Sequence, residues 1–435
     1  MSSLRQRLRE LARPIRTAII GTGSIGTGLA YQCGITPGFH PAAVADVDIA
    51  KAEQCARLMN MSYEIVENDA QLTSAFDRGV LAVSPDALLL AASDRVDVMI
   101  EASNAVYEGA LHAHTALQHG QHVVMMNYEA ELMYGPLLLS QARTSGRVYT
   151  CADGDQPAAI KQLVDDIELW NLEPVMLGNI KGFHDRYTDP AKIAPEADKR
   201  RLDHTMCSAY TDGSKLNVEM AVLANGLGAR ILRPGMTGPR MGSIYDIFQH
   251  FDFEKLWRSG DAPIVDYVLG ARPKGGVFVI GYTDDAYQQF TFSWFPPDVG
   301  PGPFYLFYRP YHLGHIEALR CAAEAFLDHS ARLAPVFGMR TNVFCYAKRD
   351  LSAGEVLDGM GGYLTYGLIE AVDSKSDTDE GLPQLISGGA RLIRDVRKDS
   401  RIALKDCDPG PCSQSYGLYR RARGLAQPAP ERGAL

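Results

Sequence analysis

The sequence predicts an α/β protein that begins with a doubly wound parallel sheet, continues as an α+β domain and ends in a small β-rich module. Over the first 150 residues, short apolar strands alternate with helical patterns, which requires crossover connections and helices on both faces of a parallel sheet. After about residue 340, short apolar runs are separated instead by Gly-rich turns. We therefore expect domains at 1–155, 156–339 and 340–408, followed by a flexible tail at 409–435.

The first domain should contain six strands joined by helices. The strands are expected at 16–21, 41–46, 80–84, 96–101, 122–126 and 147–151. The helices are expected at 25–33, 50–59, 87–92 and 105–119, with a further helix that ends near Thr144.

The middle domain mixes longer helices with β-type runs, the usual partner of a dinucleotide-binding sheet. Helices are expected at 157–170, 215–227 and 313–333. Strands are expected at 174–180, 276–282, 290–295 and 304–308.

Composition excludes several classes of protein. A net charge of -9 opposes binding to nucleic acid, because an acidic chain repels phosphate backbones. No apolar run reaches the roughly 18 residues that a membrane span needs, and the first residues do not form a secretion signal. The eight cysteines form no pair of CxxC motifs, so reduced thiols and a cytoplasmic protein are expected.

A GxGxxG motif follows the first predicted strand and opens a helix. In this context Gly21 permits the tight turn, Gly23 lets the backbone approach a pyrophosphate, and Gly26 lets the helix pack on the sheet. The N-terminus of the helix, at Ser24 and Ile25, then offers N–H groups to the phosphates. The motif predicts a Rossmann domain that binds NAD or NADP, and a Gly-rich loop in an unrelated α/β fold is the alternative.

An acidic residue, Asp46, ends the second strand about 20 residues further on, where a carboxylate takes the ribose hydroxyls. A carboxylate here repels a 2′-phosphate, so NAD is favoured over NADP. Ser103, Asn104 and Asn127 follow two later strands, and the carboxyl ends of parallel strands are where such sheets bind ligands. We expect all three to line the cofactor site, unless they belong to ordinary polar loops.

The candidate proton-transfer groups lie in the middle domain. Lys215 and Glu219 stand one helical turn apart at the start of an almost wholly apolar helix, with Asp212 just before it. Charges there are costly unless paired or used, so Lys215 is a candidate to move a proton, and an ordinary surface ion pair is the alternative. Lys181 is the other candidate for proton transfer.

Other polar residues are candidates for holding a small polar substrate. Anionic or hydroxylated groups would suit the following residues: Glu129, Asp155, His184, Arg186 and Arg309. A divalent metal held by Glu129, Asp153, Asp155 or Glu219 is conceivable, but the spacing specifies no known cage, so no metal site is assigned.

Four motifs carry a family resemblance: IIGTGSIG, VVMMNYEAELMYGP, YTCADGDQP and YTDGSKLNVEMAVLAN. Over about residues 16–408 the chain resembles homoserine dehydrogenase and, more closely, the 1-deoxy-D-xylulose-5-phosphate reductoisomerase-like proteins. AKRDLSAGEVLDGMGG resembles the antifreeze-like (SAF) domain, a β-clip often fused to that group. Tyr128 stands where homoserine dehydrogenases usually carry Lys, which makes Tyr128 a further catalytic candidate.

The resemblance implies NAD(P)-linked chemistry on a carbonyl or hydroxyl group, a catalytic and dimerising middle domain, and a homo-oligomer (dimer or tetramer). Three functions follow as hypotheses. The first is an NAD(P)-dependent dehydrogenase or reductase (EC 1.1.1.-) acting on a small metabolite such as a sugar or sugar phosphate. The second is a reductoisomerase of a phosphorylated keto-sugar, which would need a divalent metal. The third is a non-catalytic nucleotide- or carbohydrate-binding protein.

Overall fold

The computed structural model describes residues 3–200, 202–294, 299–372, 380–408, 410 and 413–425. The chain divides into two compact units, and each unit is made of two segments that are separate in the sequence. Unit 1 comprises Met1–Ala158 together with Leu313–Ala334, and unit 2 comprises Ala159–His312 together with Pro335–Leu435. The expected domain boundaries at 156 and 340 remain predictions, whereas segment 313–334, expected in the middle domain, packs with unit 1.

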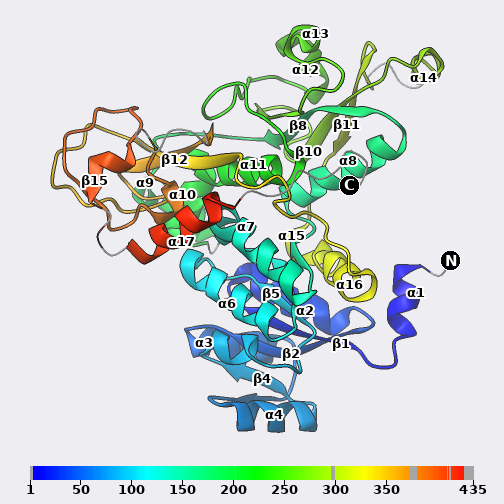
Figure 1. The fold of residues 1–435 in the computed structure, drawn as a ribbon, viewed down its shortest axis with the longest axis vertical. Helices are drawn as coiled ribbons and strands as arrows, with labels where there is room; N and C mark the ends of the chain where they lie inside the picture. Colours follow the sequence, from blue (N-terminus) through cyan, green and yellow to red (C-terminus); the bar gives the residue numbers. More distant parts are fainter. Residues whose placement is uncertain are drawn as a thin grey trace. The chain divides into compact units, whose positions relative to one another are not determined.

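Unit 1 is built on a seven-stranded sheet in the order β3-β4-β2-β1-β5-β6-β7, all of whose pairings are parallel. Figure 1 labels β1, β2, β4 and β5 of this sheet. The strands are β1 (Ile15–Ile20), β2 (Phe39–Ala45), β3 (Tyr63–Ile65), β4 (Leu81–Ser84), β5 (Val98–Glu101), β6 (His122–Met125) and β7 (Tyr149–Cys151). The strand order reverses beside β1, and open α/β sheets bind ligands beyond the carboxyl ends of the strands at such a point. The expected doubly wound parallel sheet is confirmed.

The helices of unit 1 connect successive strands, except for a short helix at the start of the chain and two in Leu313–Ala334, which we call the returning segment. They are α1 (Leu4–Arg9), α2 (Ser24–Ile35), α3 (Ile49–Leu58), α4 (Asp69–Arg78), α5 (Ala87–Ala91), α6 (Val106–Gln118), α7 (Tyr128–Ser145), α15 (Gly314–Glu317) and α16 (Leu319–Asp328). Buried side chains of the returning segment, among them Leu319, Cys321 and Ala322, share one core with Ile19 and Val124 of the sheet. The core of unit 1 is therefore completed by residues far away in the sequence.

Unit 2 contains a four-stranded mixed sheet in the order β11-β10-β8-β9. Its strands are β8 (Glu173–Lys181), β9 (Ile264–Leu269), β10 (Val277–Tyr282) and β11 (Phe304–Arg309). The helices are α8 (Gln156–Leu169, beginning in unit 1), α9 (Pro190–Arg200), α10 (His204–Asp212), α11 (Ser214–Leu227), α12 (Ile247–His250), α13 (Phe253–Leu256), α14 (Ala286–Phe292) and α17 (Ser413–Arg423).

Helix α11 is buried along its whole length. It packs against β12 (Thr341–Ala347) and β13 (Thr365–Ala371), which form an antiparallel pair, and a second short pair is made by β14 (Arg391–Leu392) and β15 (Cys407–Asp408). The side chains of Ser214 and Asn217 accept hydrogen bonds of 2.8 Å from the backbone N–H groups of Gly367 and Ile369. The β-rich C-terminal part thus shares its packing with the rest of unit 2.

Two expectations about secondary structure are wrong. Residues 290–292 of the strand expected at 290–295 lie in helix α14; the aromatic side chains of Phe290 and Phe292 suggested β structure, but Asp285 caps a helix by accepting from the N–H of Gln288 at 2.7 Å. Phe295 lies outside the described residues. The helix expected at 313–333 is two shorter helices, α15 and α16, whose last turn ends at His329 in the left-handed conformation.

The expected flexible tail is wrong for residues 413–425, where α17 forms. Tyr419 of this helix is buried and donates a 2.8 Å hydrogen bond to Glu380, and Arg423 pairs with the same carboxylate at 2.7 Å. Tyr419 and Arg423 therefore tie α17 to Glu380 of the same unit. Residues 426–435 of that expected tail lie outside the described part of the chain.

Candidate functional site

The GxGxxG turn joins β1 to α2, and two of its glycines are required by their surroundings. Gly21 has φ of +84°, and a Cβ there would lie 2.7 Å from the Cα of Ser103. A Cβ on Gly26 would lie 1.7 Å from the carbonyl oxygen of Gly21. Any other residue at these positions would force the turn open.

The middle glycine of the motif, Gly23, has a different role. A Cβ there would meet no protein atom within 4 Å, and Gly23, Ser24 and Ile25 are all exposed. Gly23 also begins α2 without a side-chain cap, and the first turn holds no acidic residue. The first N–H groups of a 12-residue helix therefore face an open space with a positive dipole end, which fits a pyrophosphate.

The carboxylate of Asp46 is fixed beside this turn. One oxygen, Oδ2, accepts from the backbone N–H of Thr22 at 2.8 Å and from its hydroxyl at 3.1 Å, and Oδ1 accepts from the N–H of Asp48 at 3.0 Å. A carboxylate has about four acceptor positions, so Asp46 can still accept from a further hydroxyl group. Its half-buried place after β2 is the one expected for a ribose-binding acid.

The loop after β5 supports the glycine turn from the other side of β1. Ser103 donates from its backbone N–H, at 3.0 Å, and from its hydroxyl to Oε1 of Glu101, and Asn104 is exposed. Glu101 is fully buried, and its other oxygen lies 2.9 Å from Nδ1 of His112. Sequence reasoning missed this buried Glu101–His112 pair, because His112 is one of several polar residues along α6.

Two residues after β6 form side-chain hydrogen bonds with backbone groups of unit 1. The side chain of Asn127 caps α7 by accepting from the N–H of Ala130 at 3.0 Å, and its amide donates to the carbonyl of Ala105 at 2.8 Å. Tyr128 is fully buried, and its hydroxyl donates to the carbonyl of Ala152 at 2.9 Å. The roles expected of Asn127, as a cofactor contact, and of Tyr128, as a catalytic group, stay predictions.

One turn further along α7, a buried carboxyl group has an unusual environment. Burial raises the pKa of Glu131 to about 7, although the hydroxyl of Tyr149 donates a hydrogen bond to it and opposes the shift. Glu129 is also buried, and Asp155 accepts from the N–H of Gln156 at 2.9 Å, at the start of α8. Both of these substrate candidates belong to unit 1.

In unit 2 a buried ion pair joins residues that are far apart in the sequence. The ammonium of Lys348 lies 2.9 Å from Oδ2 of Asp212 and donates to the carbonyls of Thr188 at 2.6 Å and Gly362 at 2.7 Å. Both side chains are almost fully buried. Burial raises the pKa of Asp212, and the charge of Lys348 opposes that rise.

His184 completes this cluster. Its Nε2 lies 2.8 Å from the carbonyl oxygen of Asp212, and its Nδ1 lies 3.4 Å from the hydroxyl of Tyr267. Burial is the main cause of a lowered pKa for His184. The structure thus brings His184 together with Asp212, which is also the ion-pair partner of Lys348, and the expected catalytic role of Asp212 stays a prediction.

The charged candidates on α11 follow directly. The N–H of Ser214 donates to Oδ1 of Asp212 at 2.8 Å, which fixes the start of α11. Lys215 and Glu219 lie on the first turns of this helix, and both are buried. The expectation of charged groups at the start of a buried helix is therefore confirmed, while their chemical role stays a prediction.

The remaining candidates occupy separate places in unit 2. Lys181 is half-buried at the end of β8, and the guanidinium of Arg186 lies 5.0 Å from the ring centre of Tyr366. Arg309, at the end of β11, donates to Gln162 at 3.0 Å and lies 4.4 Å from the ring centre of Tyr311.

Sequence reasoning did not select Lys348. It lies directly after β12, in the stretch AKRDLSAG that had been noted only for its resemblance to the SAF domain. A single lysine followed by Arg349 and Asp350 looks like a solvated surface segment, and only its contacts with Thr188 and Asp212 reveal its function.

Two kinds of feature are absent from the described residues. No group of three or more His, Cys, Asp or Glu side chains lies close enough to hold a metal ion. None of the helices in this part of the chain combines the length and apolar character needed to cross a membrane.

Comparisons with known proteins find a family similarity over part of the chain. Residues 154–318 match the family described as oxidoreductase DRL, catalytic domain. The matched stretch is well under half of the chain and contains the charged candidates of unit 2 up to Arg309. The oxidoreductase class predicted from the sequence agrees with this match.

The chain is 29% identical over 158 residues to 1-deoxy-D-xylulose 5-phosphate reductoisomerase of Jannaschia sp. (strain CCS1). The match covers 35% of this chain and 40% of that protein, so the similarity spans well under half of the relative.

Solved structures are more distant. A probable dehydrogenase from Thermotoga maritima superposes with a TM-score of 0.40 and 12% identity, over 73% of this chain and 90% of that one. A DOX-P reductoisomerase structure with fosmidomycin and magnesium gives a TM-score of 0.35 and 18% identity, over 47% of this chain and 56% of that one. Both likenesses are too distant to bear on the function of this protein, which rests on its own geometry and on the family match to residues 154–318.

Proposed function

We propose that this protein is an NAD(P)-dependent oxidoreductase that transfers a hydride between the nicotinamide and a carbonyl or hydroxyl carbon of a small polar metabolite. The observation that carries the proposal is the open glycine turn: the exposed backbone of Gly23 to Ile25 begins α2 beside the fixed carboxylate of Asp46. The match of residues 154–318 to an oxidoreductase catalytic domain supports it independently.

The residues of the turn fit a dinucleotide. The N–H groups at Ser24 and Ile25 would hold the pyrophosphate, and the space above Gly23 admits it because no side chain is present there. Asp46 would accept from the adenosine ribose, and its charge favours NAD over NADP. When bound, the nicotinamide supplies or accepts the hydride.

Lys215 is our candidate for the proton-transfer group, with Glu219 as the carboxylate that orients it and Lys181 as the alternative. Lys215 is 7% exposed. Burial in general lowers the pKa of a lysine, which suits such a residue to proton transfer. His184, Arg186 and Arg309 would bind the polar groups of the substrate, which suits a sugar or a sugar phosphate.

Titration with NADH and NADPH tests the cofactor assignment. We expect tighter binding of NADH, measured by energy transfer from tryptophan to the nicotinamide. Tighter binding of NADPH would overturn the role of Asp46 and keep the dinucleotide site. Binding of neither cofactor would remove the proposed function and favour the non-catalytic binding protein.

The role of Lys215 is tested by Lys215→Met once a substrate has been found by a carbonyl screen. Turnover should fall by about two orders of magnitude or more while NADH affinity is unchanged, since general acid–base catalysis contributes about 10² to 10⁴. Lys192→Met is the matched control, because Lys192 is an exposed lysine of the same unit that pairs with Asp189. Equal turnover in Lys215→Met and the parent protein would exclude Lys215 from the mechanism.

A reductoisomerase acting on a phosphorylated keto-sugar is the second candidate, favoured by the similarity to the Jannaschia protein. It predicts that activity on such a substrate requires a divalent metal. Activity that survives EDTA would exclude this candidate and leave the simple dehydrogenase or reductase.

Three finer features also stay part of the proposal: a homo-oligomer, an SAF-like character of residues 340–408, and a cytoplasmic location. The packing of β12 and β13 on α11 is consistent with a C-terminal part that stabilises the catalytic helix. Light scattering on the pure protein decides the oligomeric state, and a monomer at working concentration would exclude the first feature.

A further inference from the structure

The segment that returns to unit 1 reaches the dinucleotide turn. After Leu313 the chain forms α15 (Gly314–Glu317), which packs against α2, the helix that the GxGxxG motif opens. The same segment lies on the turn after β7, because a Cβ on Gly154 would come within 2.7 Å of Cβ of Glu317 and 2.8 Å of the carbonyl of Gly314. The packing on α2 and these two close approaches at Gly154 therefore fix α15 near the carboxyl edge of the sheet.

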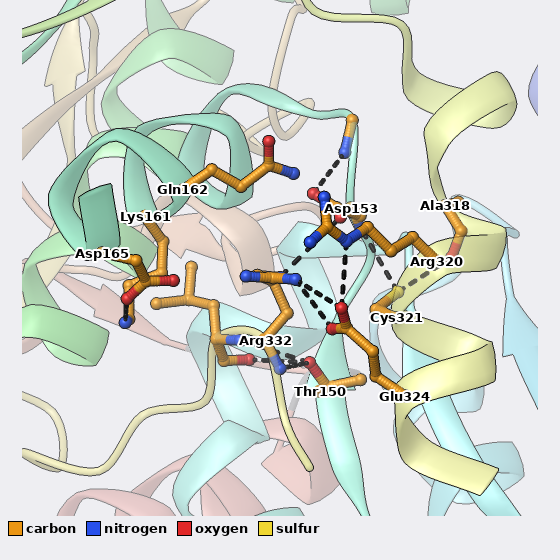
Figure 2. Close-up of polar contacts among 12 residues, drawn as sticks. Thr150, Asp153, Lys161, Gln162, Asp165, Ala318, Arg320, Cys321, Glu324 and Arg332 are labelled. Carbon is orange, nitrogen blue, oxygen red and sulfur yellow. Dashed lines mark hydrogen bonds and ion pairs between the residues drawn. The ribbon is translucent and has the colours of Figure 1, made fainter. Parts of the chain in front are cut away.

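A charge network anchors the other end of the segment (Figure 2). Arg332 donates to both oxygens of Glu324, at 2.8 and 2.7 Å, and its Nε lies 3.8 Å from the fully buried Asp153. The N–H groups of Arg332 and Leu333 donate to the hydroxyl of Thr150 at 2.8 and 3.2 Å. The position of α15 is thus set by contacts with β7 and with the turn that follows it.

This anchoring places the side chain of His315 against α2. The imidazole of His315 lies directly on Gly28, where a Cβ would come within 2.6 Å of its Cδ2 and 3.1 Å of its Nε2. Gly28 is four residues after Ser24 and three after Ile25, so all three lie on one face of α2. The ring is half-buried and sits one helical turn below the exposed N–H groups of the glycine turn.

We propose that His315 binds the dinucleotide, with an imidazole N–H that donates a hydrogen bond to the pyrophosphate held at the start of α2. The proposal rests on the proposed dinucleotide site and adds to it a side-chain donor that the GxGxxG motif does not contain. A helix N-terminus supplies backbone N–H groups alone, whereas a histidine adds a donor that strengthens when the acceptor is charged. Gly28 is needed because any side chain there would occupy the space of the ring.

The test is calorimetric titration of the full chain with NADH and with ADP-ribose, which keeps the pyrophosphate but lacks the nicotinamide. His315→Ala should lower the affinity for both ligands about tenfold, which corresponds to the loss of one hydrogen bond to a charged group. Ile316→Ala is the matched control, since Ile316 is an exposed neighbour on α15, and it should leave both affinities unchanged.

A second pair of variants separates contact from general damage. Gly28→Ala should reproduce the loss by displacing the ring, and Gly28→Ala combined with His315→Ala should bind no more weakly than His315→Ala alone. This lack of additivity is the sign of a shared effect through one ring. Thermal melting of each variant checks that the fold is intact.

Each outcome decides a different question. Unchanged affinities in His315→Ala, with NADH still bound by the parent protein, would overturn the role of His315 and keep the proposed function. Loss for NADH but not for ADP-ribose would overturn the pyrophosphate assignment, because the ring would then contact the nicotinamide half. Failure of the parent protein to bind either ligand would remove the proposed function itself.

Discussion

The two units bury charge in different ways. In unit 2 the carboxylate of Asp212 is buried with the ammonium of Lys348, whose other two hydrogen bonds go to backbone carbonyls. In unit 1 the carboxyl group of Glu131 is buried with the neutral hydroxyl of Tyr149. Burial raises the pKa of both acids; the charge of Lys348 opposes the rise at Asp212, whereas the hydrogen bond from Tyr149 opposes it at Glu131.

This difference teaches what each group can do. An acid paired with a fully engaged lysine is held as an ion and serves to join segments, whereas an acid beside a phenol exchanges its proton near neutral pH. The GxGxxG turn differs from both, since it presents backbone N–H groups at the start of α2 without an acidic residue in the first turn.

The largest expected effect comes from breaking the pair in unit 2. Lys348→Met leaves Asp212 buried without its cation, so the free energy of unfolding should fall by about 3 to 5 kcal/mol. Urea denaturation followed by circular dichroism measures this change.

The paired variant Lys348→Met with Asp212→Leu is the control for lost packing. It should recover most of the stability, because it removes the uncompensated carboxylate as well. A single variant as stable as the parent would show that the pair contributes nothing.

The second effect tests the acid in unit 1. The pKa of Glu131 is raised from 4.5 to about 7, so between these pH values the folded protein holds a proton that the unfolded chain has lost. Its contribution to stability is therefore present below pH 4.5 and is lost as the pH rises through 7. Glu131→Gln, which stays neutral, should be more stable than the parent by about 2 to 3 kcal/mol at pH 8 and equal to it at pH 4.5.

The comparison must be made between variant and parent at each pH. Burial and the neighbouring His329 and Arg147 lower the pKa of His122 to about 4, and this group loses its contribution as the pH falls from 6.5 to 4. In the parent the two slopes therefore oppose each other. A stability difference that does not vary between pH 5 and 8 would show that Glu131 titrates normally.

The smallest effect distinguishes two glycines of the dinucleotide turn. Gly23→Ala should leave the melting temperature unchanged, since no protein atom lies within 4 Å of its Cβ, yet weaken NADH about tenfold by occupying the ligand's space. Gly26→Ala should lower both the affinity and the melting temperature, because its Cβ would meet the carbonyl of Gly21. Equal NADH affinity in Gly23→Ala and the parent protein would place the cofactor elsewhere.

The sequence predicted most of unit 1 because its signals are local. Six of the seven strands were expected, and the turn chemistry of the GxGxxG motif depends on residues next to one another. The exceptions were β3, whose three residues Tyr63–Ile65 include no buried side chain, and α4, whose polar surface hides a short apolar stripe at Leu72, Ala75 and Phe76.

The rest depends on contacts between distant residues. Nothing near Lys348 in the sequence indicates Asp212, and nothing near His315 indicates Gly28. Asn127 was expected at a ligand site because of its place after a strand, and Tyr128 was expected to be catalytic because of the family resemblance. Only the structure shows that their polar atoms meet the backbone of Ala152, Ala130 and Ala105.

The discontinuity of unit 1 has a consequence for how the chain is made. A ribosome releases the seven strands of the sheet early, but Leu319, Cys321 and Ala322, which share the core of that sheet, emerge only after all of residues 159–312 have been translated. Domains usually fold as units while synthesis proceeds, and an unfinished core exposes apolar surface that invites aggregation. The core of the nascent sheet therefore stays incomplete, exposed or bound by a chaperone, until the residues up to about 334 have been synthesised.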